Sequence, residues 1–87
     1  MDPIRIAFVD DHPTLLAGIA AIFSGLTRFK IVGTGAVADA ALRIAEAESP
    51  DVMVLDLSMP GDVFATISQL TSRRPPVRVV LFTAFSN

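Results

Sequence analysis

Short apolar runs alternate along this chain with stretches of helical periodicity, and this alternation restricts the possible folds more than any other feature. The apolar runs are Ile4–Val9, Val52–Leu55 and Val77–Phe82, with a weaker fourth run at Phe29–Val32. Each run is too short for a typical helix and is rich in branched or aromatic side chains. Such runs are typical of strands buried on both faces of a parallel sheet.

Helical patterns fill the intervals between the runs. Apolar residues recur at helical spacing after the start signals Asp11 and Pro13, across the alanine-rich stretch Ala38–Ala47, and from Val63 to Leu70. The resulting order is β-α-β-α-β-α-β with short connections. We therefore expect an α/β fold, with a parallel sheet and helices on both of its faces.

Length and composition favour one small soluble domain. The chain has 87 residues, a net charge of −2, 52% apolar residues and no cysteine. A core is feasible but thin, because a chain of this size buries only about 60% of its unfolded surface. Without cysteine, neither a disulfide framework nor a thiolate metal site is possible.

Charge and hydropathy exclude two classes of partner. The seven lysines and arginines are scattered, with only Arg73 and Arg74 adjacent. Nucleic-acid binding normally needs basic residues clustered on one surface, so we expect no direct DNA contact by this chain. No apolar run approaches the roughly 20 residues that span a bilayer, and no signal-peptide pattern opens the chain. A cytoplasmic protein without a membrane partner is the simplest expectation.

Carboxylates stand at the ends of the predicted strands. Asp10 and Asp11 follow the first, Asp56 ends the third, and Thr83 ends the fourth. Ligands of open α/β sheets bind outside these carboxyl ends. If the first and third strands are neighbours, three like charges converge and repel by about 4 kcal/mol per pair at roughly 4 Å. A hard divalent cation such as Mg²⁺ would offset this repulsion.

Such an arrangement suits phosphoryl transfer. A carboxylate can attack phosphorus to give an aspartyl-phosphate, and Mg²⁺ with a hydroxyl such as that of Thr83 would bind the other phosphoryl oxygens. Taken singly, each aspartate is more typical of a turn or a helix cap. An acidic doublet, a lone aspartate and a threonine at three strand ends are hard to explain as unrelated caps.

Three motifs resemble the receiver domain of two-component response regulators. They are Val9-Asp10-Asp11-His12-Pro13, the stretch Pro50–Gly61, and Leu81-Phe82-Thr83-Ala84. The Asp-Asp-His-Pro opening is most similar to receivers that precede a LuxR-type helix-turn-helix output domain. The resemblance implies a flavodoxin-like, doubly wound parallel sheet of strand order 2-1-3-4. It also implies a signalling protein that controls transcription and is not itself an enzyme.

The resemblance also implies a role for each residue of the site. Asp56 would accept a phosphoryl group from a sensor histidine kinase, Thr83 would be the switch hydroxyl, and Ala84 would leave the phosphoryl group access. The Mg²⁺ ligands would be Asp10, Asp11, Asp56 and the backbone carbonyl of Ser58, with Asp11 preferred as the direct ligand of the doublet. His12, beside Pro13, we expect to start the helix and to take no part in this chemistry.

The loop after Asp56 departs from the family pattern. The family has a further residue and a second glycine after the motif Met59-Pro60-Gly61, whereas here Gly61 leads straight to Asp62 and Val63. A glycine would permit a positive φ that Val63 tolerates badly. We therefore expect the loop to be remodelled.

A second departure concerns the end of the chain. The family pattern continues through another helix, a fifth strand that carries a lysine, and a final helix, whereas the sequence ends at Asn87 with Lys30 as its only lysine. We expect residues 1–87 to form an incomplete receiver with four strands and three helices, without that ammonium partner. Its apolar fourth strand would be an exposed edge, which favours self-association.

Two other functions remain open from the sequence. Gly33-Thr34-Gly35-Ala36-Val37-Ala38 fits the G-x-G-x-x-A fingerprint of dinucleotide-binding folds, with Asp56 then on the ribose. That interpretation leaves the Asp10–Asp11 doublet and the Met59–Gly61 motif unexplained. The other alternative is a receiver that is not phosphorylated and acts only through its surfaces, as an interaction or oligomerisation module.

Overall fold

The computed structural model describes residues 2–82, in which strands and helices alternate strictly. The elements are β1 (Ile4–Val9), α1 (Pro13–Ser24), β2 (Phe29–Gly35), α2 (Ala38–Glu48), β3 (Val52–Asp56), α3 (Val63–Thr71) and β4 (Arg78–Phe82). Every predicted strand and helix is present. The main difference is in β2, which was expected to end before Gly33 and instead continues to Gly35.

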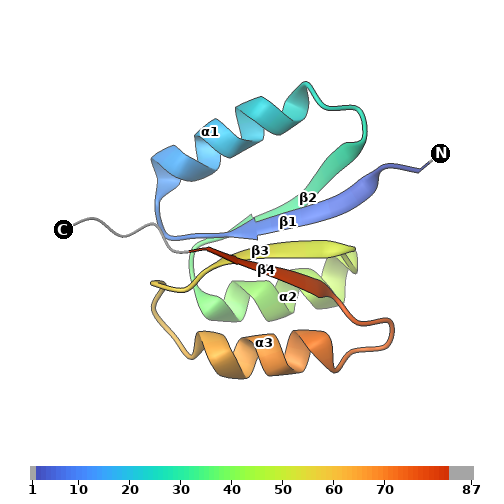
Figure 1. Ribbon diagram of the computed structural model, residues 1–87. Coiled ribbons are helices and arrows are strands. Elements are labelled where there is room, and N and C mark those ends of the chain that lie inside the picture. Colours follow the sequence, from blue (N-terminus) through green and yellow to red (C-terminus); the bar gives the residue numbers. More distant parts are fainter. Residues whose placement is uncertain (1, 83–87) are drawn as a thin grey trace.

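The strands form one parallel sheet in the order β2-β1-β3-β4. Figure 1 shows α1 on one face of this sheet and α2 with α3 on the other. This is the doubly wound, flavodoxin-like arrangement expected from the sequence, including the strand order 2-1-3-4. The order places β1 and β3 side by side, which was the condition for the convergence of their carboxylates.

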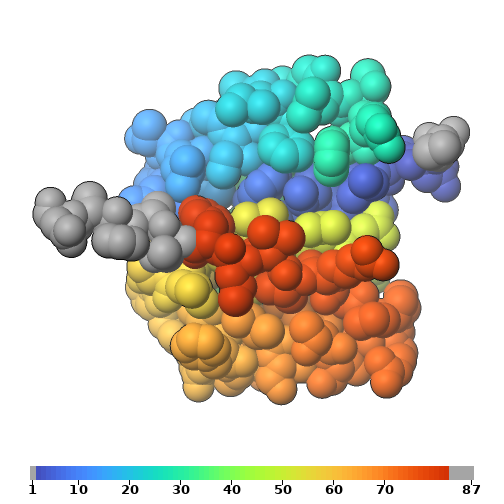
Figure 2. Space-filling view, viewed as in Figure 1, coloured from blue at the N-terminus to red at the C-terminus, as the bar shows by residue number. Residues whose placement is uncertain are grey.

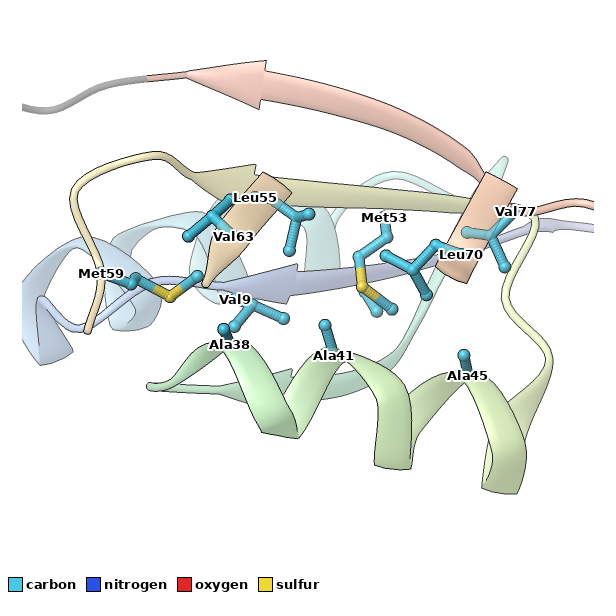
Figure 3. Packing of buried hydrophobic residues seen from close by; sticks show 11 residues of the cluster. Val9, Ala38, Ala41, Ala45, Met53, Leu55, Met59, Val63, Leu70 and Val77 are labelled. Atoms are coloured by element: carbon cyan, nitrogen blue, oxygen red, sulfur yellow. The ribbon is translucent and has the colours of Figure 1, made fainter. Parts of the chain in front are cut away.

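The main core lies between the sheet and the two helices α2 and α3 (Figure 3). Every fully buried residue of helix α2 is an alanine, so its backbone approaches the sheet closely, while larger buried side chains come from β3 and α3. Met53, Leu55 and Leu70 are completely buried. The full cluster is Ala7, Val9, Ala38, Ala41, Ala45, Met53, Leu55, Met59, Val63, Leu70 and Val77.

The glycines of β2 contribute to the same close approach. A Cβ added at Gly33 would lie 2.9 Å from Ile44 Cγ2, and one added at Gly35 would overlap the Cβ of Ala40. Both glycines lie within the strand and not in a turn after it. A dinucleotide-binding fingerprint needs its first glycines in that turn, so the structure does not support the dinucleotide interpretation.

The opposite face of the sheet is covered more thinly. No residue of α1 is fully buried, and Ile22 is 66% exposed. Three aromatic rings form this layer: Phe23 packs edge-on against Phe8 and Phe29, at centroid distances of 5.2 Å each. None of the helices within residues 2–82 has the length and apolar character of a segment that crosses a membrane.

Candidate functional site

The carboxyl ends of β1 and β3 bring two buried aspartates together. Asp56 is the last residue of β3, and Asp10 directly follows β1, whose Val9 pairs with Leu55. The amide of Asp10 donates to the carbonyl of Gly35 at 2.9 Å, so the backbone at this point is still tied to the sheet. Because the strands are parallel and end at the same edge (Figure 1), both carboxylates lie on the side where ligands bind.

The site contains one more acidic group and an imidazole. One oxygen or nitrogen atom from each of Asp10, Asp11, His12 and Asp56 lies within 4.8 Å of the others, so the group could hold a metal ion. Asp10 and Asp56 are buried, whereas the Asp11 side chain is 36% exposed. The convergence of three carboxylates that the sequence predicted is therefore present.

Ser58 fixes the carboxylate of Asp56. Its backbone amide and its hydroxyl both donate to Oδ1 of Asp56, at 2.9 Å and 2.7 Å. The sequence singled out Ser58 for its carbonyl oxygen, and that ligand role remains a prediction. The hydroxyl contact was not foreseen, although a hydroxyl residue two positions after an aspartate is a common partner of its side chain.

His12 occupies a place that the sequence interpretation did not give it. As expected it caps α1, because it is the N-cap residue and its carbonyl accepts from Leu16. Its ring, however, turns toward the carboxylates: Nδ1 lies 2.6 Å from Asp10 Oδ1, 3.1 Å from Asp11 Oδ1 and 3.6 Å from Asp56 Oδ2. The sequence interpretation did not foresee these contacts, and the expectation that His12 takes no part in the phosphoryl-transfer chemistry stays a prediction. The available signal was its place directly after the acidic doublet.

These contacts shift two pKa values in opposite directions. Donation to Asp10, with added attraction from Asp11 and Asp56, raises the pKa of His12 above 6.5 despite some desolvation. Burial raises the pKa of Asp56, but the two hydrogen bonds from Ser58 and the charge of His12 outweigh it and leave that pKa below 3.8. Asp56 is therefore ionised at neutral pH.

Two carboxylate oxygens in the cluster lack a hydrogen-bond donor among the described residues. Within residues 2–82, Oδ2 of Asp10 and Oδ2 of Asp56 are buried without a hydrogen-bond partner. Unpaired buried oxygens are unfavourable and are normally satisfied by water, an ion or a ligand. They are the second structural feature, besides the clustering of charge, that indicates a cation.

The other predicted site residues are placed less fully. Thr83 and Ala84 lie outside the described residues, so their expected roles remain predictions. Lys30 is the second residue of β2 and pairs with Arg5, at the amino end of the sheet. As expected, its ammonium is on the opposite edge from Asp56.

The short loop before α3 is accommodated by Gly61. The positive φ of the loop, +107°, falls on Gly61, and Val63 instead starts α3 and is buried. Asp62 caps the helix by accepting from the amide of Ala65 at 3.0 Å. The loop also contacts α2, where the amide of Ala38 donates to the carbonyl of Pro60.

Comparison with known proteins points in one direction. Residues 6–87 match the sequence model of the family described as "Response regulator receiver domain". The nitrate/nitrite response regulator protein NarL of Escherichia coli K12 is 31% identical over 83 residues, which are 94% of this chain and 38% of that protein. The response regulator protein VraR of Staphylococcus aureus is 31% identical over 83 residues, which are 94% of this chain and 40% of that protein. The chain thus spans about two fifths of the length of these curated relatives.

Solved structures agree with the sequence matches. The receiver domain of the putative response regulator NarL from Mycobacterium tuberculosis superposes with a TM-score of 0.87 at 32% identity, covering 100% of this chain and 71% of that one. The non-phosphorylated receiver domain of RcsB from Escherichia coli gives a TM-score of 0.84 at 24% identity and covers 99% of this chain and 69% of that one. At that identity the second match shows the shared fold alone.

Proposed function

Because this chain belongs to the response regulator receiver domain family, we propose that it accepts a phosphoryl group on Asp56 from a phosphohistidine of a sensor kinase. The observation that carries the proposal is the state of Asp56. Its carboxylate is completely buried at the end of β3, held by Ser58 and next to Asp10. A carboxylate that serves only as a turn or cap residue has no need of this environment.

Mg²⁺ is the metal that we propose for the phosphoryl-transfer reaction. The donor set fits, because Asp10, Asp11 and Asp56 supply hard oxygens and two of those oxygens lack a hydrogen-bond donor within residues 2–82. The carbonyl of Ser58 completes the proposed ligands. When bound, the metal would neutralise charge on the transferring group.

The residues themselves carry the remaining steps. Ser58 holds the Asp56 carboxylate in one orientation, and the lowered pKa of Asp56 keeps it ionised. An oxygen of Asp56 attacks phosphorus, the N–P bond of the donor breaks, and the donor imidazole keeps the electron pair and takes a proton. Thr83 would turn its hydroxyl to the phosphoryl group, with Ala84 leaving space for it. The chain is an acceptor in this reaction and does not turn over a substrate.

The consequence that we propose for phosphorylation is control of transcription. The relatives include proteins named as response regulators, but this chain covers only 38–40% of the two compared above. DNA contact would therefore belong to segments outside the matched region, in line with the scattered basic residues of this one. The location that goes with a sensor-kinase partner is the cytoplasm.

Treatment with a small phosphodonor tests the proposal. With acetyl phosphate and Mg²⁺, we expect the intact protein to gain the mass of one phosphoryl group. The gain should vanish in Asp56→Asn and persist in Asp39→Asn, a matched change at an exposed position on α2. Chelation of the divalent ion should also abolish the gain.

A negative result would be equally informative. If the wild type gains no mass although circular dichroism shows a folded protein that unfolds cooperatively on heating, phosphoryl transfer by this chain is excluded. Phosphorylation that persists in Asp56→Asn would instead contradict the assignment of the acceptor.

Strand β4 supports a second candidate, self-association as an interaction module. It is the outermost strand on its side of the sheet within residues 2–82, and Val80 and Leu81 are 51% and 44% exposed. Figure 2 shows β4, in red, at the surface between α1 and α3. Exposed apolar edges pair with other chains.

Light scattering tests this second candidate. At high micromolar concentration the wild type should form a dimer or a larger species, and Val80→Lys should shift it to the monomer. A monodisperse wild-type monomer would count against this function.

A further inference from the structure

The ring of His12 is placed to donate to a metal ion and not only to pair with one carboxylate. An imidazole that simply balances Asp10 would need one close contact. His12 Nδ1 instead lies 2.6 Å, 3.1 Å and 3.6 Å from oxygens of Asp10, Asp11 and Asp56. It therefore lies within 3.6 Å of an oxygen of each carboxylate in the cluster.

Independent support comes from the buried oxygens. Oδ2 of Asp56 has no hydrogen-bond donor within the described part of the chain and lies 3.6 Å from this nitrogen. Oδ2 of Asp10 likewise lacks a donor there. A cation at this point would satisfy both oxygens and would find the ring nitrogen within reach.

We propose that His12 Nδ1 joins the carboxylates of Asp10, Asp11 and Asp56 as a metal ligand. We further propose that the site binds a borderline first-row ion, of which Zn²⁺ and Co²⁺ are the probes, more tightly than it binds Mg²⁺. Carboxylate and carbonyl oxygens suit Mg²⁺, whereas a neutral imidazole adds affinity for the ions higher in the Irving–Williams order. The combination of His12 with Asp10, Asp11 and Asp56 is a nitrogen-plus-oxygen set of the kind that Zn²⁺ accepts.

The four candidate donor atoms lie within 4.8 Å of one another, so they would have to draw closer to bind a tetrahedral ion. Ligands at tetrahedral zinc lie about 3.3 Å from one another, given bond lengths of about 2.0–2.1 Å. To bind a metal, Nδ1 must carry no proton, so the neutral ring then has its proton on Nε2. The His12 side chain is 49% exposed, so the ring has room to adjust.

This inference rests on the metal-binding part of the proposed function and does not require phosphoryl transfer. Its test therefore uses metal alone, without a phosphodonor, so a failure of either idea can be recognised separately. His12 is the only histidine of the chain, so its imidazole nitrogens give unambiguous NMR signals. At pH about 8, addition of Zn²⁺ should fix the Nε2–H tautomer and move the Nδ1 resonance to a metal-bound position. Mg²⁺ should leave both nitrogens unligated.

A variant supplies the second measurement. Calorimetric titration of the wild type should give tighter binding for Zn²⁺ than for Mg²⁺. In His12→Ala the affinity for Zn²⁺ and Co²⁺ should fall by roughly tenfold or more, with Mg²⁺ affinity changed much less. The visible absorption of bound Co²⁺ should change in the same variant, because a nitrogen donor leaves the metal.

Several results would overturn the inference. They are an unligated Nδ1 in the presence of saturating Zn²⁺, equal losses of Zn²⁺ and Mg²⁺ affinity in His12→Ala, or no loss for either ion. The NMR measurement needs no substitution, so it decides the matter even if the variant folds poorly.

Discussion

Ser58 holds one oxygen of Asp56 with two hydrogen bonds, from its amide at 2.9 Å and its hydroxyl at 2.7 Å. The same carboxylate leaves its other oxygen, Oδ2, facing the ring of His12. Asp56 is thus held on one side by its own loop and faces the acidic cluster on the other. The two hydrogen bonds from Ser58 therefore stabilise both the loop between β3 and α3 and the ionised form of Asp56.

Replacing Ser58 by alanine should destabilise both the ionised form of Asp56 and the fold. In Ser58→Ala the hydrogen bond from the backbone amide remains and the one from the hydroxyl is lost, so the pKa of Asp56 should rise. The free energy of unfolding at neutral pH should fall by about 1 kcal/mol, since solvent can replace part of the lost bond. Carboxyl ¹³C titration and urea denaturation measure the two effects. Ser24→Ala, which removes an exposed bond to the carbonyl of Ala21, should change neither.

Two glycine-to-alanine substitutions should change the free energy of unfolding in opposite directions. Gly61 has φ +107° and an added Cβ would lie 2.9 Å from that of Ala38, so Gly61→Ala should destabilise the fold by more than about 1 kcal/mol. Gly18 lies within α1 with nothing near its added Cβ, so Gly18→Ala should stabilise by about 0.5–1 kcal/mol. Thermal unfolding followed by circular dichroism distinguishes them, and shifts of the same sign would contradict this account of the loop.

Because the core is thin, truncating one buried side chain should lower the free energy of unfolding strongly. Leu70 is completely buried between α3 and the sheet, so Leu70→Ala should lower the free energy of unfolding by about 2–5 kcal/mol. That is a large part of the 5–15 kcal/mol typical of a whole domain. Leu26, which is 43% exposed, provides the matched control, and Leu26→Ala should have a much smaller effect. Comparable losses from the two changes, measured in urea, would place the core elsewhere.

The histidine gives the metal-free protein a defined pH dependence. The pKa of His12 is raised above 6.5 chiefly through Asp10, so the folded state binds this proton more tightly than the unfolded chain does. The resulting stabilisation is fully present below about pH 6.5 and is lost as pH rises through the folded pKa. In a chelator-containing buffer, NMR titration should show a pKa that falls in Asp10→Asn. An unchanged pKa in that variant would show that Asp10 is not the main cause.

The element order followed from local signals. Runs such as Val52–Leu55 and the stripe from Val63 to Leu70 are set by side-chain periodicity, and turn or cap residues such as Asp62 limit them. The ends of the strands were also predicted closely from the sequence, except in β2, where Gly33 was expected to end the strand. Packing against α2 keeps that glycine inside the strand, which is a tertiary effect that no local pattern contains.

The sequence by itself determined that Asp10, Asp11 and Asp56 lie at the carboxyl edge of a parallel sheet, because each directly follows or ends a strand. Only the tertiary structure decided what these groups contact. The ring of His12 turns into the acidic cluster at the ends of β1 and β3, and Gly61, with its positive φ, lies close to Ala38 of α2. Such contacts depend on how distant segments pack, and side-chain direction across them is not encoded in the spacing of residues along the chain.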